Sequence, residues 1–261
     1  MKLTIITCTY NSESTIEKCI DSVFLQWFDD KEYEHIFVDA NSTDETIAII
    51  KKKYHNKSNY TIISSQPKWA YNAMNIGISH AKWIYLYLLN SDDAIHTTWL
   101  SSLLSSAIKN NSDFCFGNVR YVDIHNKLLR TLTPRKFFPF FLKKKLYKNL
   151  LFVSHYCCPQ STVYKKTLHD TLWSYNESYK FLSDREFSIK VASSHCRTNY
   201  VDIDVCDFLV HSWSLTSNKN NHKKMYEEVY LIVNQHFFYG LGYMRVSFVK
   251  LIRFFLWFFS K

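Results

Sequence analysis

The sequence WIYLYLLNSDD, residues 83–93, contains an apolar run that stops on two adjacent carboxylates, Asp92 and Asp93. The run is long enough for a buried strand, but Asp is a poor strand former and is costly to remove from water. In an open α/β sheet, ligands bind just beyond the carboxyl ends of the strands. The stretch therefore predicts a metal and phosphate site at Asp92 and Asp93, with a polar turn that caps the next helix as the alternative.

Elements that alternate along the first half of the chain predict the fold class. Short β-branched or apolar runs, typical of buried strands, alternate with segments whose apolar residues recur at helical spacing. The expected strands are 2–9, 34–38, 60–64 and the run from 83, and the expected helices are 14–27, 42–54, 69–80 and 97–108. Ser14 with Glu17 and Ser42 with Glu45 match capping boxes. This order predicts an α/β fold with a mostly parallel central sheet and helices on both faces.

The second half of the chain is less regular. Residues 113–123 and 127–133 alternate like a hairpin, 161–165 and 201–208 are expected strands, and 183–192 and 222–238 are expected helices. No internal repeat or low-complexity linker marks a domain boundary.

Composition limits the class of protein. The formal charge of +9 indicates an anionic partner, such as a nucleotide, a nucleic acid or an acidic membrane surface. Only four glycines occur, at 77, 117, 240 and 242, which excludes the glycine patterns of P-loop enzymes, dinucleotide-binding folds and α/β-hydrolases. The seven cysteines include no C-x-x-C, so we expect reduced, packing thiols in a cytosol-facing protein. We also expect neither a secretory signal nor a membrane-spanning segment.

A second acidic point, Asp39, ends the strand expected at 34–38. In a parallel sheet it lies on the same edge as Asp92 and Asp93. A nucleotide-sugar site needs this arrangement, since one carboxylate holds the base or ribose and another holds a divalent cation that neutralises the diphosphate. The alternative for Asp39 is a simple turn residue.

Four ordered blocks of sequence resemble family 2 glycosyltransferases of the GT-A fold. They are TIITCTYNSESTIEKCIDSV (4–23), FVDANSTDETI (37–47), AYNAMNIGISHAKWIYLYLLNSDD (70–93) and FLSDREFSIKV (181–191). The resemblance covers roughly the first 110 residues well and about 155–217 loosely. It implies transfer of a hexose or N-acetylhexosamine from a nucleotide-sugar donor, with a UDP-sugar expected, to a hydroxyl of a saccharide or lipid-linked oligosaccharide. It also implies inversion of the anomeric centre by direct displacement.

The resemblance assigns the donor side of the site. Thr9, Tyr10, Asn11 and Glu13 would line the nucleotide pocket, and Asp39 would hydrogen-bond the nucleobase.

The resemblance implies that the carboxylate pair, Asp92 and Asp93, binds the metal, Mn²⁺ or Mg²⁺. Asp93 is the stronger ligand candidate, and Asp92 would touch both the metal and the ribose. His211 is a further candidate ligand, with a structural role as the alternative.

On the acceptor side, the resemblance makes Asp184 the catalytic base, and the alternative is a helix N-cap. Gln160 stands near a polar position of the acceptor loop. The chain departs from the family pattern at Gln66–Trp69, at Asn72, where Asp is frequent, and at Pro159, where His is common. These departures bear on the donor sugar rather than on the phosphate site.

Two basic and aromatic stretches predict a membrane-facing surface. In residues 243–261, taken as a helix, basic residues occupy one half and aromatic or aliphatic residues the other. This pattern is typical of a helix that lies in a membrane interface, and residues 137–152 have similar chemistry. The alternatives are packing on the same domain or burial in a homodimer.

These patterns divide the chain into three parts. We expect a nucleotide-sugar-binding half (1–110), an acceptor and catalytic-base half of the same domain (111–217), and a C-terminal helical, membrane-associated segment (218–261). The expected protein is a glycosyltransferase of surface polysaccharide synthesis, peripheral on the cytoplasmic face of the cell membrane. A sugar-nucleotide pyrophosphorylase is disfavoured, because it would need a glycine-rich phosphate loop near the N-terminus and this sequence has none there. A non-catalytic membrane-surface or nucleic-acid-binding protein leaves the four carboxylates unexplained, and no nucleic-acid motif is found.

Overall fold

Strand β1 (Leu3–Thr9) is the centre of the parallel half of the sheet. The computed structural model places it between β2 (Tyr33–Asp39) and β4 (Tyr85–Leu88), and β3 (Tyr60–Ser64) lies beyond β2, with every pair parallel. These strands are rich in Ile, Val, Leu, Phe and Tyr, and β1, β2 and β4 are buried over most of their length. The carboxyl ends of the three strands therefore meet at one edge, as the sequence predicts.

The structure describes part of the chain and divides it into two units, Met1–His211 and Ser212–Lys261. The described residues are 2–26, 28–97, 99–133, 158–172, 174–211 and 219–237. The basic and aromatic stretches 137–152 and 243–261 lie outside the described residues, and so do Trp27, Thr98 and Cys157. The second unit contains helix α8 (His222–Phe237), close to the expected bounds.

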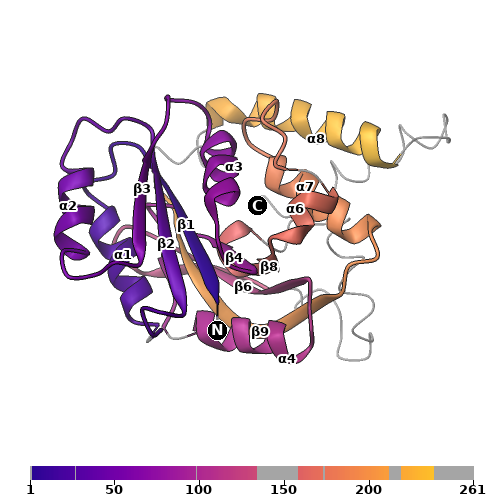
Figure 1. The fold of residues 1–261 in the computed structure, drawn as a ribbon. Coiled ribbons are helices and arrows are strands. Elements are labelled where there is room, and N and C mark those ends of the chain that lie inside the picture. Colours follow the sequence, from indigo (N-terminus) through magenta and orange to yellow (C-terminus); the bar gives the residue numbers. More distant parts are fainter. Residues whose placement is uncertain are drawn as a thin grey trace. The chain divides into compact units, whose positions relative to one another are not determined.

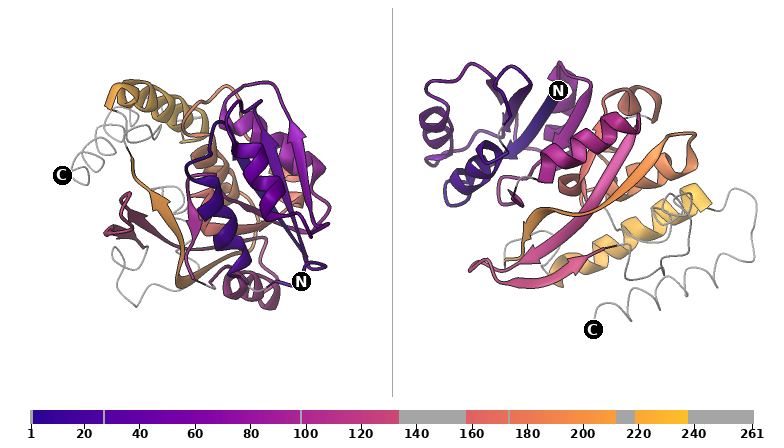
Figure 2. Two further views of the ribbon diagram at one scale, coloured as in Figure 1. Left: turned by 90° about the vertical axis from the view of Figure 1, so that its left-hand side faces the viewer. Right: turned by 90° about the horizontal axis from the view of Figure 1, so that it is seen from below.

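The other half of the sheet is mixed rather than parallel. β4 pairs antiparallel with β8 (Thr162–Lys165), which pairs antiparallel with β6 (Phe114–Val122). β6 then runs parallel to the long strand β9 (Thr198–Leu209), and the short β5 (Ala94–Ile95) closes the order on β9. β7 (Leu128–Leu132) forms the predicted hairpin with β6 (Figure 2). The sheet is therefore mixed rather than mostly parallel. Strands β3 to β4 are parallel and so is the pair of β6 and β9, but β8, β5 and β7 run in the opposite direction.

Helices cover both faces of the sheet (Figure 1). α1 (Ile16–Phe24), α2 (Thr46–Lys53) and α4 (Trp99–Lys109) pack on the face to which Leu3 and Ile5 of β1 point. α3 (Ala70–His80), α6 (Thr167–Leu172) and α7 (Ser183–Ser193) pack on the face of Ile6. The alternation of Ile5 and Ile6 between two cores is the strand period of two.

Gly77 sets how closely α3 approaches the sheet. A Cβ atom at this position would lie 3.3 Å from Cγ2 of Val38 on β2 and only 2.4 Å from Cγ2 of Ile6 on β1. Glycine costs helical propensity, so its position within α3 is explained by this close packing rather than by the helix itself.

Neither predicted capping box forms. α1 begins after Thr15 and α2 after Glu45, and neither residue caps its helix with a side-chain hydrogen bond. Glu17 instead pairs with Lys53 of α2, with 2.8 Å between Oε1 and Nζ. The hydroxyl of Ser42 donates to Asp39. A contact between two helices thus takes the side chain of Glu17, and a local turn takes that of Ser42.

The sequence patterns did not predict three short elements. β5 has two residues, α6 has six, and a 3₁₀ turn, η2 (Pro159–Ser161), precedes β8. Ile108, expected on the inner face of α4, is 44% exposed. Among the described residues, no helix combines the length and apolarity that crossing a membrane requires.

A buried histidine makes the stability of the fold pH-dependent. His35 on β2 is fully buried, with Nε2 2.9 Å from Oγ1 of Thr7 and Nδ1 2.7 Å from the hydroxyl of Tyr54. Burial lowers the pKa of His35 from 6.5 to about 3. The unfolded chain therefore takes up the proton first as the pH falls, and the folded state loses stability between pH 6.5 and about 3.

We expect the free energy of unfolding to fall by about 2 kcal/mol between pH 7 and pH 5 on account of His35 alone. Urea unfolding at the two pH values measures the fall, and His35→Gln should reduce it by that amount. The matched control is His80→Gln at an exposed histidine of α3. An equal pH dependence in His35→Gln and the wild type would contradict the assignment.

Candidate active site

Three loops meet at the carboxyl ends of β1, β2 and β4. The hub is Ser12, which follows β1: its backbone N–H donates to Oγ1 of Thr46 at 2.7 Å, and its hydroxyl lies 2.8 Å from that of Ser91. Two loop residues, Asn11 and Asn41, have positive φ angles of 47° and 59°, a conformation that Asn tolerates better than most residues. The predicted donor segments are therefore brought together by hydrogen bonds between loops.

Asp39 is buried at the end of β2 and is held through both carboxylate oxygens. Oδ1 accepts hydrogen bonds from the hydroxyls of Thr9 (2.8 Å) and Ser42 (2.6 Å), and Oδ2 accepts one from the backbone N–H of Ser42 (2.9 Å). A carboxylate has about four lone-pair sites, so the described residues leave Oδ2 one further acceptor site. The carboxylate is thus fixed in place and can still accept an N–H from a ligand.

Glu13 and Asn11 hold the loops together. Oε2 of Glu13 accepts the backbone N–H of Glu45 at 3.0 Å, and Oδ1 of Asn11 accepts the N–H of Thr43 at 2.9 Å. Tyr10 is 59% exposed beside them. The structure therefore places Glu13 in a loop-to-loop contact at the rim of the predicted nucleotide pocket.

The two adjacent carboxylates have different surroundings. Asp93 is 2% exposed, and its Oδ1 accepts the backbone N–H of Leu209 at 2.9 Å while Oδ2 accepts Nδ2 of Asn90 at 3.2 Å. Burial, with the charge of Asp92 second, raises the pKa of Asp93 well above its usual value. The side chain of Asp92 is 34% exposed, and its Oδ2 lies 2.9 Å from Nε2 of His211. Asp92 is thus the more accessible of the pair, and Asp93 anchors the end of β9.

A divalent cation fits the donor atoms at Asp92 and His211. A carboxylate oxygen and an imidazole nitrogen already lie within 2.9 Å of each other. Oxygen donors suit Mg²⁺ and Mn²⁺, and imidazole is accepted by transition metals. Nowhere in the described ranges do three or more His, Cys, Asp or Glu side chains gather as a ready metal site. Catalytic Mg²⁺ sites commonly use one or two carboxylates and complete the set with substrate phosphates.

Asp184 lies in the first turn of α7, but it is not the N-cap, which is Leu182. Its Oδ1 accepts hydrogen bonds from the hydroxyl of Tyr71 at 2.8 Å and from the N–H of Arg185 at 2.8 Å. Tyr71 belongs to the first turn of α3, which starts beyond the carboxyl end of β3. Asp184 is therefore held at the same edge of the sheet as Asp39 and Asp92.

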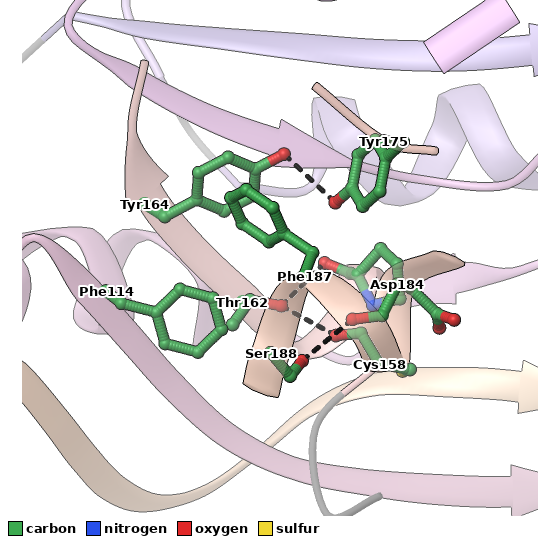
Figure 3. A pocket seen from close by; sticks show the side chains of 9 residues that line it. Phe114, Cys158, Thr162, Tyr164, Tyr175, Asp184, Phe187 and Ser188 are labelled. Atoms are coloured by element: carbon green, nitrogen blue, oxygen red, sulfur yellow. Dashed lines mark hydrogen bonds between the residues drawn. The ribbon is translucent and has the colours of Figure 1, made fainter. Parts of the chain in front are cut away.

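A small pocket with aromatic walls lies next to Asp184 (Figure 3). The lining residues are Phe114, Cys158, Pro159, Thr162, Tyr164, Tyr175, Asp184, Phe187 and Ser188. The hydroxyls of Tyr164 and Tyr175 lie 3.3 Å apart. The rings of Tyr164 and Tyr175 also contact Phe187 of α7, with ring centres 5.7 and 5.2 Å apart, and so pack against this helix.

Gln160 is 2% exposed in the turn η2 beside this pocket. Its carbonyl oxygen accepts the hydroxyl of Tyr87 on β4 at 2.5 Å. Its side-chain Oε1 is buried and has no hydrogen-bond partner among the described residues. The backbone of Gln160 thus fixes the turn against β4.

The sequence did not indicate that Tyr71 holds Asp184 or that Ser42 holds Asp39. Nor did it indicate an ion cluster behind the site: Asp207 of β9 contacts Nδ1 of His96 at 3.2 Å and Nε of Arg120 at 3.1 Å. Ser42 lies three residues after Asp39, and an Asx-type turn was a readable signal. No local pattern indicated the other contacts.

Comparison with known proteins decides the family. The sequence model of glycosyl transferase family 2 matches residues 4–173. The chain belongs to this family. It is therefore a glycosyltransferase, and its mixed sheet with helices on both faces is the GT-A fold that the resemblance implied. The pyrophosphorylase and non-catalytic alternatives are set aside.

Relatives of this family 2 chain differ in the substrates that their names state. A PGL/p-HBAD biosynthesis glycosyltransferase of Mycobacterium bovis is 28% identical over 208 residues, covering 78% of this chain and 75% of the relative. TarS 1–349 of S. aureus in complex with UDP-GlcNAc superimposes with a TM-score of 0.69 at 20% identity, covering 91% and 68% of the two chains. The mannosyltransferase PcManGT of Pyrobaculum calidifontis, in complex with GDP-Man and Mn²⁺, gives 0.64 at 16% identity, covering 97% and 68%.

Proposed function

We propose that this chain is an inverting, metal-dependent glycosyltransferase of cell-surface polysaccharide or glycolipid synthesis. It moves a sugar from a nucleoside diphosphate, with UDP the favoured nucleotide, to a hydroxyl of a lipid-linked saccharide. The observation that carries the proposal is the gathering of Asp39, Asp92 and Asp184 at the carboxyl edge of the parallel strands. That edge is where open α/β sheets bind their ligands.

The donor side of the site is assigned to the β1, β2 and β4 ends. The remaining acceptor site on Oδ2 of Asp39 suits the ring N–H of a uracil base, and Thr9, Tyr10 and Asn11 would line the pocket for the nucleotide. Both UDP-GlcNAc in the TarS complex and GDP-Man in PcManGT are nucleoside diphosphate sugars. Asp92 and His211 would hold Mn²⁺ or Mg²⁺, and Asp93 holds the end of β9, which leads to His211. The cation, when bound, supplies positive charge that offsets the charge on the leaving diphosphate.

The acceptor side of the site is assigned to Asp184. A sugar hydroxyl is a weak nucleophile until a carboxylate takes its proton. Asp184 accepts that proton as the hydroxyl oxygen bonds to the anomeric carbon and the bond from that carbon to the β-phosphate oxygen breaks. The electron pair of the broken bond leaves with the nucleoside diphosphate. One displacement from the opposite face inverts the anomeric centre.

We expect Mn²⁺ together with UDP to raise the melting temperature of the wild type, and Asp92→Asn to lose the metal-dependent part of that rise. Ligand at about 100 times its Kd stabilises the folded state by about 2.7 kcal/mol. Transfer by Asp92→Asn should fall about 100-fold, since the charge on the leaving group is no longer offset. Thermal unfolding and a coupled assay of nucleotide release across nucleotide sugars measure both effects.

Asp170→Asn on α6 is the matched control, an exposed carboxylate that should behave as the wild type. An unchanged metal response in Asp92→Asn would contradict the metal assignment. Retention of configuration in the product, read by NMR, would contradict the single displacement.

Asp184→Asn should lower kcat about 100- to 10,000-fold, because the amide cannot accept the proton of the acceptor. Binding of the donor nucleotide, measured by calorimetry, should stay within twofold to threefold of the wild type, about 0.5 kcal/mol. Loss of nucleotide binding would instead indicate a structural residue, and full transfer activity would remove Asp184 from the mechanism.

A membrane-facing surface is assigned from sequence to residues 243–261, which lie outside the described residues. The segment combines basic residues with Phe, Leu and Ile, and this mixture binds anionic interfaces. A lipid-linked acceptor would reach an enzyme held at the cytoplasmic face of the membrane.

Removal of residues 243–261 should weaken binding to vesicles of anionic phospholipid about 100-fold or more, measured by co-sedimentation. Vesicles of neutral phosphatidylcholine are the control and should bind both forms weakly. Equal binding of the full chain and the shortened chain to anionic vesicles would rule out this anchor.

A further inference from the structure

Helix α3 holds the segment that leads into α7. The side chain of Asn75 pairs with the backbone of Tyr175 twice, through Nδ2 to the carbonyl oxygen (2.9 Å) and through Oδ1 from the N–H (3.0 Å). Asn72 donates to Oε2 of Glu177 at 2.8 Å. Nζ of Lys180 lies 3.4 Å from the ring centre of Trp69, just before α3. One helix end thus fixes residues 175–180 along their length.

Tyr71, also on α3, extends this contact to Phe181 and Asp184. Its ring is 6% exposed and lies 5.6 Å from the ring of Tyr175, so it has little freedom to move. Its hydroxyl oxygen lies 2.9 Å from the carbonyl oxygen of Phe181 and 2.8 Å from Oδ1 of Asp184. A phenol has one proton, so it can donate fully to only one of these two acceptors at a time.

We propose that Tyr71 is a positioning residue whose single phenolic proton follows the charge of Asp184, an inference that rests on Asp184 being the base. While Asp184 is ionised, Tyr71 donates to Oδ1, because hydrogen bonds to charged groups are the stronger ones. Once Asp184 has taken the proton of the acceptor hydroxyl, Tyr71 turns its O–H to the carbonyl of Phe181. With that proton on Oδ2, Oδ1 is the weaker, carbonyl-type acceptor and keeps the N–H of Arg185, and no bond to carbon is made or broken at Tyr71.

The phenolic proton of Tyr71 is thus hydrogen-bonded in both charge states of Asp184, first to Oδ1 and then to the carbonyl oxygen of Phe181, and no heavy atom has to move. A fixed donor would stabilise only the ionised form and would oppose proton uptake. Titratable and charged groups in the described surroundings of Asp184 are Tyr71 on α3, Tyr175 in the preceding loop, Cys158 next to η2, and Arg185 and Glu186 on α7. Of these side chains, Tyr71 is the one with a hydroxyl shared between Asp184 and a backbone carbonyl.

Tyr71→Phe tests the proposal on the full chain, with UDP-GlcNAc as the first donor probe or the donor found in the nucleotide-sugar assay. Loss of the donor makes ionised Asp184 less favourable, so the acid limb of the kcat/KM profile should move up by about one pH unit. On that limb the rate should drop about tenfold, while the donor KM stays within twofold. Tyr175→Phe is the matched control, since it removes a hydroxyl from the same cluster whose hydrogen bond goes to Tyr164. Its acid limb should stay in place.

The double variant Tyr71→Phe/Asp184→Asn separates a positioning role from a packing role. If Tyr71 acts through Asp184, its loss has no further effect on the residual rate of Asp184→Asn, and the two effects are non-additive. Additive losses, or an acid limb of Tyr71→Phe that coincides with the wild type, would overturn the inference. Full activity of Asp184→Asn would instead remove the base assignment itself, a different outcome. If Tyr71→Phe unfolds, Tyr71→Met, which fills a similar space without a hydroxyl donor, takes its place, and its acid limb must lie above that of the wild type for the inference to stand.

Discussion

The parallel pairing of β1 with both β2 and β4 is the constraint on which the site depends. It aligns Thr9 with Asp39 and brings the end of β4 to the same edge, so three loops start from neighbouring points. The loops then hold one another through short hydrogen bonds centred on Ser12, Ser42 and Asp39. A sheet of another order would leave the same polar residues on separate surfaces. In this GT-A enzyme the order of the strands determines which carboxylates lie at the same edge of the sheet.

Burial gives the adjacent carboxylates separate tasks. Asp93 exchanges water for the N–H of Leu209 and the amide of Asn90, and this links the first half of the chain to the end of β9. That link places His211, two residues later, against Asp92. The buried position beside the charge of Asp92 disfavours a second negative charge and so raises the pKa of Asp93. The more exposed Asp92 is the carboxylate that a ligand reaches first in this structure, while the assignment of Asp93 as the stronger metal ligand stays a prediction.

Much of the fold could be predicted from sequence because its parallel half follows simple periods. The apolar runs of β1, β2 and β4 are followed by polar residues, and this pattern places Asp39, Asp92 and Asp93 at or just after strand ends. Apolar residues at helical spacing mark α1 to α4. The antiparallel entry of β8 and the two-residue β5 carry no such signal. Contacts such as Tyr71 with Asp184 span 113 residues, and local patterns hold no information on them. Asn72, a departure from the family pattern, has a physical reason: it donates to the carboxylate of Glu177, which an Asp could not do.

The closeness of α3 to the sheet has a consequence for the chemistry. Gly77 lets α3 rest on Ile6 of β1, and the same helix carries Tyr71 to Asp184 six residues earlier. The position of α3 above the sheet therefore sets where Tyr71 meets Asp184, the residue proposed as the base. Under the proposed mechanism, a single methyl group added at the buried face of α3 would alter the proton transfer to Asp184, although it touches no part of the site. Turnover in such an enzyme can be tuned from its interior.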